Sequence, residues 1–345
     1  MKGSTKTLII SMAATIVALV GLAFLAEWLD GRRTMKVAGL DTILTESLRE
    51  CMDGNDSLIC GMISMKETGS ACNPRKLLLV RPHLEQDIWS DRYDSRATVL
   101  PEALMQTATL TFFMDRRYIK PEYMVLISDG DSISVREGFL ASSREVADWM
   151  VTGDDRRLYE ASSFFQEKFD DYFGSSESCY IPKAQYRFKE TAASIADGYG
   201  LLLSQEQILT FFDSIANGGV RARHRYFRKR RICREETARQ ITELLRENVT
   251  DGTGTALAGL PLQIAGKTGV GMLELGNIPG KGKVSEKDSV TVASFAGFFP
   301  ADSPKYTMCV TLYSDTPGCQ PDDLAMDIFG KIATRINEND EIWKR

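Results

Sequence analysis

One short motif could bind an anionic group at the end of a predicted strand. Lys267-Thr268-Gly269 follows the apolar run 262–266, which predicts a strand, and two further β-like runs come later, at 290–302 and 305–313. A lysine ammonium beside a strand attracts carboxylates, and a free strand edge can pair with an extended peptide. The motif therefore indicates a site for a peptide that carries a carboxylate.

The chain lacks the residue pairs that a reactive serine of this kind of site would need. A serine becomes a nucleophile when a base such as lysine lies one helical turn away, which gives the pattern Ser-x-x-Lys. No serine of this chain has a lysine three positions later, and none has an asparagine two positions later. The Lys-Thr-Gly motif is therefore present without either of these serine-containing pairs.

Composition excludes several other classes of function. The 345 residues are 43% hydrophobic and 26% charged with a net charge of −5, which is typical of a globular protein and does not favour nucleic acid as a ligand. The seven cysteines form no Cys-x-x-Cys pair and there are two histidines, so we expect no metal and no other cofactor. Reduced, buried cysteines are favoured over a disulfide framework.

The N-terminal region predicts a membrane anchor. Residues 7–26 form an uncharged, apolar run of about the length that crosses a bilayer. A cleaved signal peptide is the alternative, but its apolar core is shorter, about 7–15 residues. We therefore expect a tail at 1–6, a transmembrane helix at 7–26, a linker at 27–39 and one domain at 40–345.

The pattern of that domain predicts α-helices around a sheet, an α/β (α+β) fold. The spacing of apolar residues predicts a strand at 57–65 and helices at 40–50 (with Asp41 as N-cap), 101–114, 143–171, 204–217, 235–248 and 321–339. Proline at position 101 is typical of the first residue of a helix.

A basic segment, Arg221–Arg234, contains eight lysines and arginines within fourteen residues. A solvated loop is the simpler interpretation. Contact with anionic lipid head groups is the functional alternative, because each cation near such a surface adds about 1 kcal/mol of attraction.

Four segments in order resemble the transpeptidase domain of class B penicillin-binding proteins, over roughly residues 40 to 340. They are 61–69, 198–219 (with Gly-Tyr-Gly and Ala-Asn-Gly-Gly), 249–256 (with Gly-Thr-Gly) and 293–301 (Ala-Ser-Phe-Ala-Gly-Phe-Phe-Pro-Ala). The resemblance implies an antiparallel sheet flanked by helices. A phosphate-binding loop at Gly266-Lys267-Thr268 is the alternative, and it is disfavoured because the required glycine at position 261 is a proline here.

The same resemblance implies a degenerate site. The family carries its nucleophile in a run of the form Tyr-x-Pro-Gly-Ser-Thr-x-Lys-Pro at a helix start. Matched to Tyr93–Pro101, that run has Ala97 in place of the serine and Leu100 in place of the lysine. The Ser-x-Asn motif is matched to Thr152-Gly153-Asp154, and Lys267, Thr268 and Gly269 remain as substrate-binding residues.

The resemblance thus predicts a catalytically inactive, membrane-anchored protein whose domain faces the periplasm and which lacks the family's N-terminal pedestal domain. It would bind the peptidoglycan stem peptide or a cell-wall or division protein. The alternative is an active DD-transpeptidase or carboxypeptidase with Ser95 or Thr98 as nucleophile.

Overall fold

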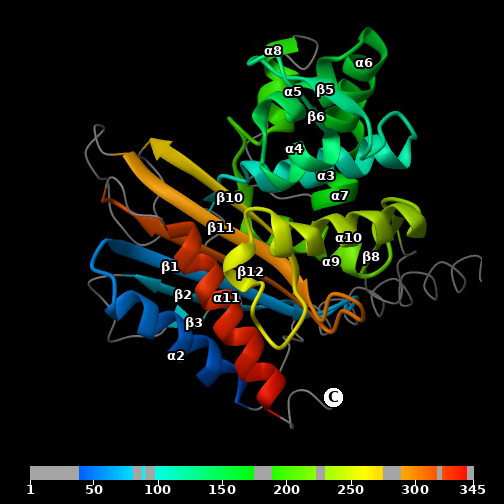
Figure 1. The fold of residues 1–345 in the computed structure, drawn as a ribbon. Helices are drawn as coiled ribbons and strands as arrows, with labels where there is room; N and C mark the ends of the chain where they lie inside the picture. Colours follow the sequence, from blue (N-terminus) through cyan, green and yellow to red (C-terminus); the bar gives the residue numbers. More distant parts are fainter. Residues whose placement is uncertain are drawn as a thin grey trace, which may run out of the picture.

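A computed structural model describes residues 39–80, 88–89, 98–174, 189–222, 230–274, 289–316 and 321–339. Figure 1 shows two layers of helices on either side of one sheet. The sheet has six antiparallel strands in the order β10-β11-β12-β1-β2-β3. Their bounds are Ala265–Glu274 (β10), Ser289–Phe299 (β11), Tyr306–Ser314 (β12), Leu58–Glu67 (β1), Arg75–Val80 (β2) and Ile88–Trp89 (β3). The predicted antiparallel sheet flanked by helices is confirmed.

The two faces of the sheet bury separate cores because strand side chains alternate between faces. On β11, Phe295 and Phe299 pack with the helices α2 (Leu40–Asp53) and α11 (Pro321–Glu338). Ala296 and Phe298 belong to the opposite core, with α3 (Ala103–Asp115), α9 (Gln205–Ala216) and α10 (Glu235–Asp251). α11 lies diagonally across its face in Figure 1. The candidate site belongs to the second face, where α3 and α10 meet β10.

Shorter elements complete the second layer. The helices are α4 (Val135–Leu140), α5 (Arg144–Thr152), α6 (Asp155–Ser163), a π-helix at Phe164–Lys168, α7 (Phe169–Phe173), α8 (Lys189–Ala196) and a 3-10 turn at Thr255–Leu257. The two-stranded pairs are β4 (Thr98–Val99) with β7 (Leu203–Ser204), β5 (Met124–Leu126) with β6 (Ser132–Ser134), and β8 (Val220–Arg221) with β9 (Arg230–Arg231).

Several predicted helix limits are wrong, each for a local reason. The expected helix 143–171 is divided after Thr152, because Asp154 caps a new helix by accepting a hydrogen bond from the backbone of Arg157. Asp41 does not cap α2; its carboxylate binds Arg75 on β2. The helix expected from Pro101 begins at Ala103, because Glu102 has φ 43° and ψ −133°, outside the helical region.

The predicted membrane anchor and the predicted reduced cysteines can be compared with the structure only where residues are described. No helix among those residues combines the length and apolar character that a bilayer span needs. The predicted anchor at 7–26 lies outside the residues that the structure describes. Within them, Cys60, Cys72, Cys233 and Cys309 are free cysteines.

Candidate functional site

Lys267 lies inside the molecule, at the meeting point of β10, α10 and the loop between α4 and α5. Its side chain is fully buried. The ammonium donates to the hydroxyl of Ser142 at 2.5 Å and to Oδ1 of Asn248 at 3.1 Å, with the hydroxyl of Thr253 at 3.5 Å. The Phe139 ring adds a cation–π contact with its centroid 4.9 Å from Nζ.

All these partners are neutral, which sets the acid–base state of the lysine. Burial lowers the pKa of Lys267 to about 7, and no carboxylate offsets that effect. The hydroxyl of Thr268 joins the same network through Thr253, at 2.9 Å. Near neutral pH the site therefore presents an amine that gains a proton readily when an anionic group approaches.

The start of α3 lies against β10 beside this network. Gly269 allows the approach, because a side chain there would lie 2.5 Å from the carbonyl oxygen of Pro101. Ala103 is the first helical residue, and Gln106 lies one turn later. Nε2 of Gln106 donates to Oδ1 of Asp197 at 2.6 Å and lies 3.4 Å from the carbonyl oxygen of Ser142. The first turn of α3 thus contacts the loop that holds Lys267.

A cluster of charged side chains surrounds that first turn. Glu102 is 8% exposed, and Asp197 is 5% exposed. Oδ2 of Asp197 accepts a hydrogen bond from Nε of Arg144 at 2.6 Å. Burial, followed by the negative charge of Asp197, raises the pKa of the Glu102 carboxyl to about 7, against the smaller opposing effect of Arg144.

The predicted degenerate catalytic pair is not placed at a helix start. Ala97 and Ser95 lie outside the described residues, and Thr98 belongs to β4, where it pairs with Ser204 of β7. Leu100 is buried and precedes the helix by three residues. The expectation that position 100 lies one turn into a helix is wrong, because the chain is extended at Thr98–Val99.

Thr152 and Asp154 are also separated from the network around Lys267. Thr152 ends α5 and donates to the carbonyl oxygen of Asp148 at 2.9 Å. Asp154 caps α6 and binds Nε of Arg157 at 2.9 Å. Both side chains thus serve local helix ends, and neither contacts Lys267 among the interactions of the described chain.

Ser142 is the site residue that the sequence analysis missed. It has φ 55°, a backbone conformation that few residues other than glycine adopt. Ser143 follows it and caps α5 by accepting from the backbone of Val146. The usable signal was Ser142-Ser143-Arg144 directly before a helix, a Ser-x-Asn pattern with arginine in the last place.

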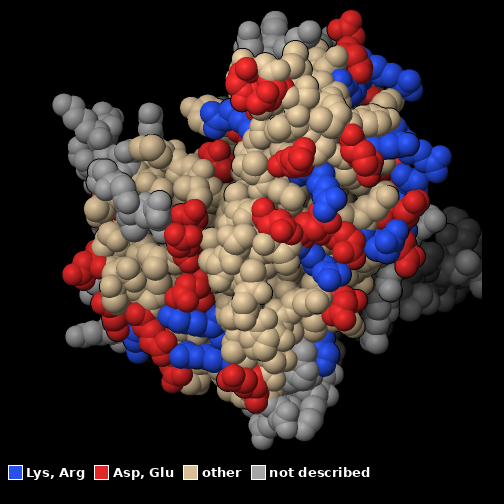
Figure 2. Space-filling model, in the orientation of Figure 1, with Lys and Arg blue, Asp and Glu red and all other residues tan. Residues whose placement is uncertain are grey.

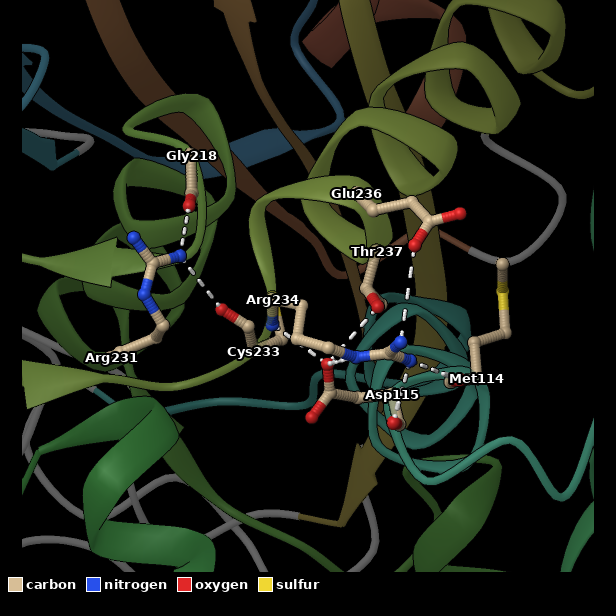
Figure 3. Close-up of polar contacts among 8 residues, drawn as sticks. All are labelled: Met114, Asp115, Gly218, Arg231, Cys233, Arg234, Glu236 and Thr237. Carbon is tan, nitrogen blue, oxygen red and sulfur yellow. Dashed lines mark hydrogen bonds and ion pairs between the residues drawn. The ribbon is translucent and has the colours of Figure 1, made fainter.

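The described part of the basic segment binds the protein itself (Figure 3). Arg234 donates from its backbone to Oδ1 of Asp115 at 2.7 Å, and from Nη2 to the carbonyl oxygen of Asp115 at 2.7 Å. It thereby joins the start of α10 to the end of α3. Arg231 donates to the carbonyl oxygens of Gly218 and Cys233, and Arg230 pairs with Asp171.

These contacts bear on the predicted role of the segment. Arg221 likewise donates to the carbonyl oxygen of Asp170 at 2.7 Å, whereas positions 223–229 lie outside the described residues. On the face drawn in Figure 2, acidic and basic side chains are interspersed over the coloured surface. Contact with anionic lipid stays a prediction, and these four arginines act within the fold.

The comparisons with known proteins agree with the fold. Residues 171–334 match the family model described as "Penicillin binding protein transpeptidase domain", a range that contains Lys267 but neither Ser142 nor the start of α3. The protein named "Probable peptidoglycan D,D-transpeptidase PenA" from Neisseria gonorrhoeae is 31% identical over 132 residues, 36% of this chain and 21% of that protein. Its counterpart from Neisseria meningitidis serogroup A is 30% identical over the same length. The match thus spans about a fifth of the length of these relatives.

Solved structures share the fold at low identity. The transpeptidase domain of penicillin-binding protein 3 from Burkholderia pseudomallei superposes with a TM-score of 0.63 at 16% identity, covering 86% of this chain and 92% of that one. Penicillin-binding protein 3 from Mycobacterium tuberculosis, complexed with aztreonam, gives 0.61 at 17% identity, covering 86% and 77%. Residues 171–334 thus match the transpeptidase domain model, and the chain shares its fold with transpeptidase domains of penicillin-binding proteins.

Proposed function

We propose that this protein is a membrane-anchored, transpeptidase-like component of the cell-wall machinery that binds the peptidoglycan stem peptide, or a division protein, without forming an acyl-enzyme. The observation that carries the proposal is the first turn of α3. Ala103 begins this helix and Gln106 lies one turn later, in contact with the loop of Ser142. A helix start without a hydroxyl and without an amine offers neither nucleophile nor base.

This turn also supports a new match to the family motif. The family run Pro-Gly-Ser-x-x-Lys is aligned with residues 101–106, Pro-Glu-Ala-Leu-Met-Gln, so that Glu102 takes the position of the glycine. The positive φ of Glu102 favours this match, because glycine is the residue that adopts such a conformation without strain. Ala103 then replaces the serine and Gln106 the lysine, whereas the earlier match used Ala97 and Leu100.

The other half of the site supports non-covalent binding. Ser142-Ser143-Arg144 takes the place of Ser-x-Asn, and its serine holds the ammonium of Lys267. Lys267 and Thr268 are then the groups that attract the terminal carboxylate of a peptide. Binding without chemistry requires that this half keep its geometry. Asn248 and Thr253 support that geometry by accepting hydrogen bonds from Lys267 and Thr268.

Labelling with a fluorescent penicillin tests the assignment. The protein is compared with the triple variant Glu102→Gly/Ala103→Ser/Gln106→Lys, and with Ala97→Ser/Leu100→Lys as the matched control. We expect no covalent label on the wild type or on the control, and label on the triple variant, because it alone regains a serine and a lysine one turn apart at a helix start.

Two results would contradict the proposal. Label on the wild type would show a working nucleophile. Label on the Ala97→Ser/Leu100→Lys control would show that the family's nucleophile motif matches residues 93–101. Calorimetry tests the non-covalent function directly. It measures how tightly a peptide ending in D-Ala-D-Ala binds to the wild type and to Lys267→Met. A peptide that binds both proteins equally would exclude Lys267 as the carboxylate-binding group.

The predicted anchor has its own test. Residues 7–26 would hold the domain at the cytoplasmic membrane, on the periplasmic side. The full chain should then stay in the membrane fraction after an alkaline wash, and externally added protease should digest its domain in spheroplasts. Release by the wash, or protection of the domain, would contradict the proposed location.

A further inference from the structure

The charged cluster at the first turn of α3 has one negative charge more than it can balance internally. Two carboxylates, Glu102 and Asp197, are almost completely buried. Arg144 is the cation that acts on them, and it is bound to Asp197 through Nε at 2.6 Å. Gln106 adds a neutral hydrogen bond to the same carboxylate. Among the residues that the structure describes, one buried carboxylate thus remains without a cation.

Glu102 is that carboxylate. In the part of the chain that the structure describes, its side chain accepts no hydrogen bond and forms no ion pair within 4 Å, although it is 8% exposed. Buried carboxylates are ordinarily paired, because leaving one unpaired costs free energy. An unpaired one at the edge of a candidate binding site indicates a partner that arrives with a ligand.

The backbone holds Glu102 in this position at some cost. Its φ of 43° is unfavourable for a residue with a side chain. Two glycines make room: a side chain at Gly198 would lie 2.3 Å from the Glu102 carbonyl oxygen, and one at Gly271 would lie 2.4 Å from Oε1. The carboxyl therefore lies against β10, on the strand that also carries Lys267.

The rim of the cluster is open to solvent and already holds a cation. The Arg144 side chain is 72% exposed, and Tyr199 is 61% exposed. The guanidinium carbon of Arg144 lies 5.9 Å from the centroid of the Tyr199 ring. An aromatic face next to buried carboxylates is a favourable place for an ammonium group.

We infer that Glu102, together with Asp197 and the ring of Tyr199, forms a binding site for a primary ammonium group of the ligand. The site lies beside the carboxylate-binding residues Lys267 and Thr268, so the ligand would carry both a free amine and a carboxylate. That the carrier is a peptide rests on the proposed function. The amine site itself rests on the charge deficit, which is independent of it.

The first experiment measures the amine alone. The carboxyl carbon of Glu102 is followed by NMR in the full chain, with propylammonium chloride and with sodium chloride at equal ionic strength. We expect propylammonium to lower the pKa of Glu102 with a saturable dependence on concentration, and sodium to lower it less and without saturation. Equal effects of the two salts would overturn the inference, whatever the protein's function.

The second experiment uses Nα-acetyl-L-lysyl-D-alanyl-D-alanine with its side-chain amine either free or acetylated. We expect the free amine to bind about tenfold more tightly, as one charge-assisted hydrogen bond would give. Glu102→Gln should remove the preference, whereas the matched control Glu122→Gln, at an exposed glutamate, should keep it. Equal binding of the two peptides to the wild type would overturn the inference while leaving the proposed function in place. Failure of both peptides, with saturable propylammonium binding, would refute the proposed function and keep the amine site.

Discussion

Two neighbouring parts of the site bury a charge in opposite ways. Lys267 has neutral partners only, so burial alone acts on it and lowers its pKa to about 7. Glu102 has charged neighbours of both signs and, within the described ranges, no direct partner, and its pKa rises to about 7. Lys267 is held in a network of hydrogen bonds, whereas Glu102 belongs to a cluster with two carboxylates and one described cation.

The difference indicates that Lys267 keeps its position, whereas Glu102 changes its interactions when a ligand binds. A lysine that is held by a hydroxyl and an amide keeps its position whether or not it is protonated. A carboxyl without a partner changes its interactions when a cation arrives, because a new charge nearby is the largest change that its surroundings can undergo.

The largest expected effect comes from a variant that disturbs the close contact between Gly198 and the backbone of Glu102. Gly198→Ala places a methyl group 2.3 Å from the Glu102 carbonyl oxygen at a φ of +85°, and we expect a loss of about 3–4 kcal/mol in the free energy of unfolding. Gly200→Ala is the control: its φ is +77° but nothing lies within 4 Å, so the loss should be about 1 kcal/mol. Urea denaturation of both variants gives the difference. Equal losses would mean that the contact with Glu102 is unimportant.

The next effect is a pH dependence of the free energy of unfolding that distinguishes Glu102 from Lys267. The pKa of Glu102 is raised in the folded state, so its ionisation destabilises the fold as the pH rises from about 4.5 to about 7. Glu102→Gln should match the wild type near pH 4.5 and be more stable by about 2–3 kcal/mol at pH 8, because one pKa unit corresponds to about 1.4 kcal/mol. A stability difference that is constant over this range would show that the Glu102 carboxyl is not responsible.

Lys267→Met should give the smallest change in stability and the opposite dependence on pH. The lowered pKa means that the charged lysine destabilises the fold fully below pH 7, and the penalty fades as the pH rises toward 10.5. We expect a gain of about 1 kcal/mol at pH 6 that disappears by pH 10, because lost hydrogen bonds offset part of the lifted penalty. Thermal unfolding at both pH values measures it. A larger gain at pH 10 than at pH 6 would contradict the assignment.

Residue patterns were sufficient wherever a structure depends on neighbours in the chain. Helix α9 is an example: Ser204 and Gln207 form a reciprocal cap, and the helix ends before Gly218 and Gly219, close to the predicted limits 204–217. The strands β11 and β12 were predicted close to their observed limits, because apolar runs indicate burial. The strand predicted at 262–266 is misplaced, since β10 begins at Ala265 and continues to Glu274. The antiparallel sheet flanked by helices followed from these local signals together with the resemblance.

The candidate site was predicted on one side only. Lys267 and Thr268 were found because their motif is contiguous, and the structure places both in one network. Helix α3 begins at Ala103, two residues after the predicted start at Pro101, and Ala97 lies outside the described residues. Ser142 was not predicted, because its contact with Lys267 joins positions 125 residues apart in the chain.

By itself, the sequence determined the class of fold, the retained Lys267-Thr268-Gly269 and the absence of a Ser-x-x-Lys pair, all of which are local patterns. The tertiary structure alone decided that Lys267 meets Ser142 across 125 positions, and that Glu102 is buried beside Asp197. The physical reason is that a pKa, an unpaired charge and a positive φ all depend on what packs around a residue, and that packing joins segments far apart in the chain.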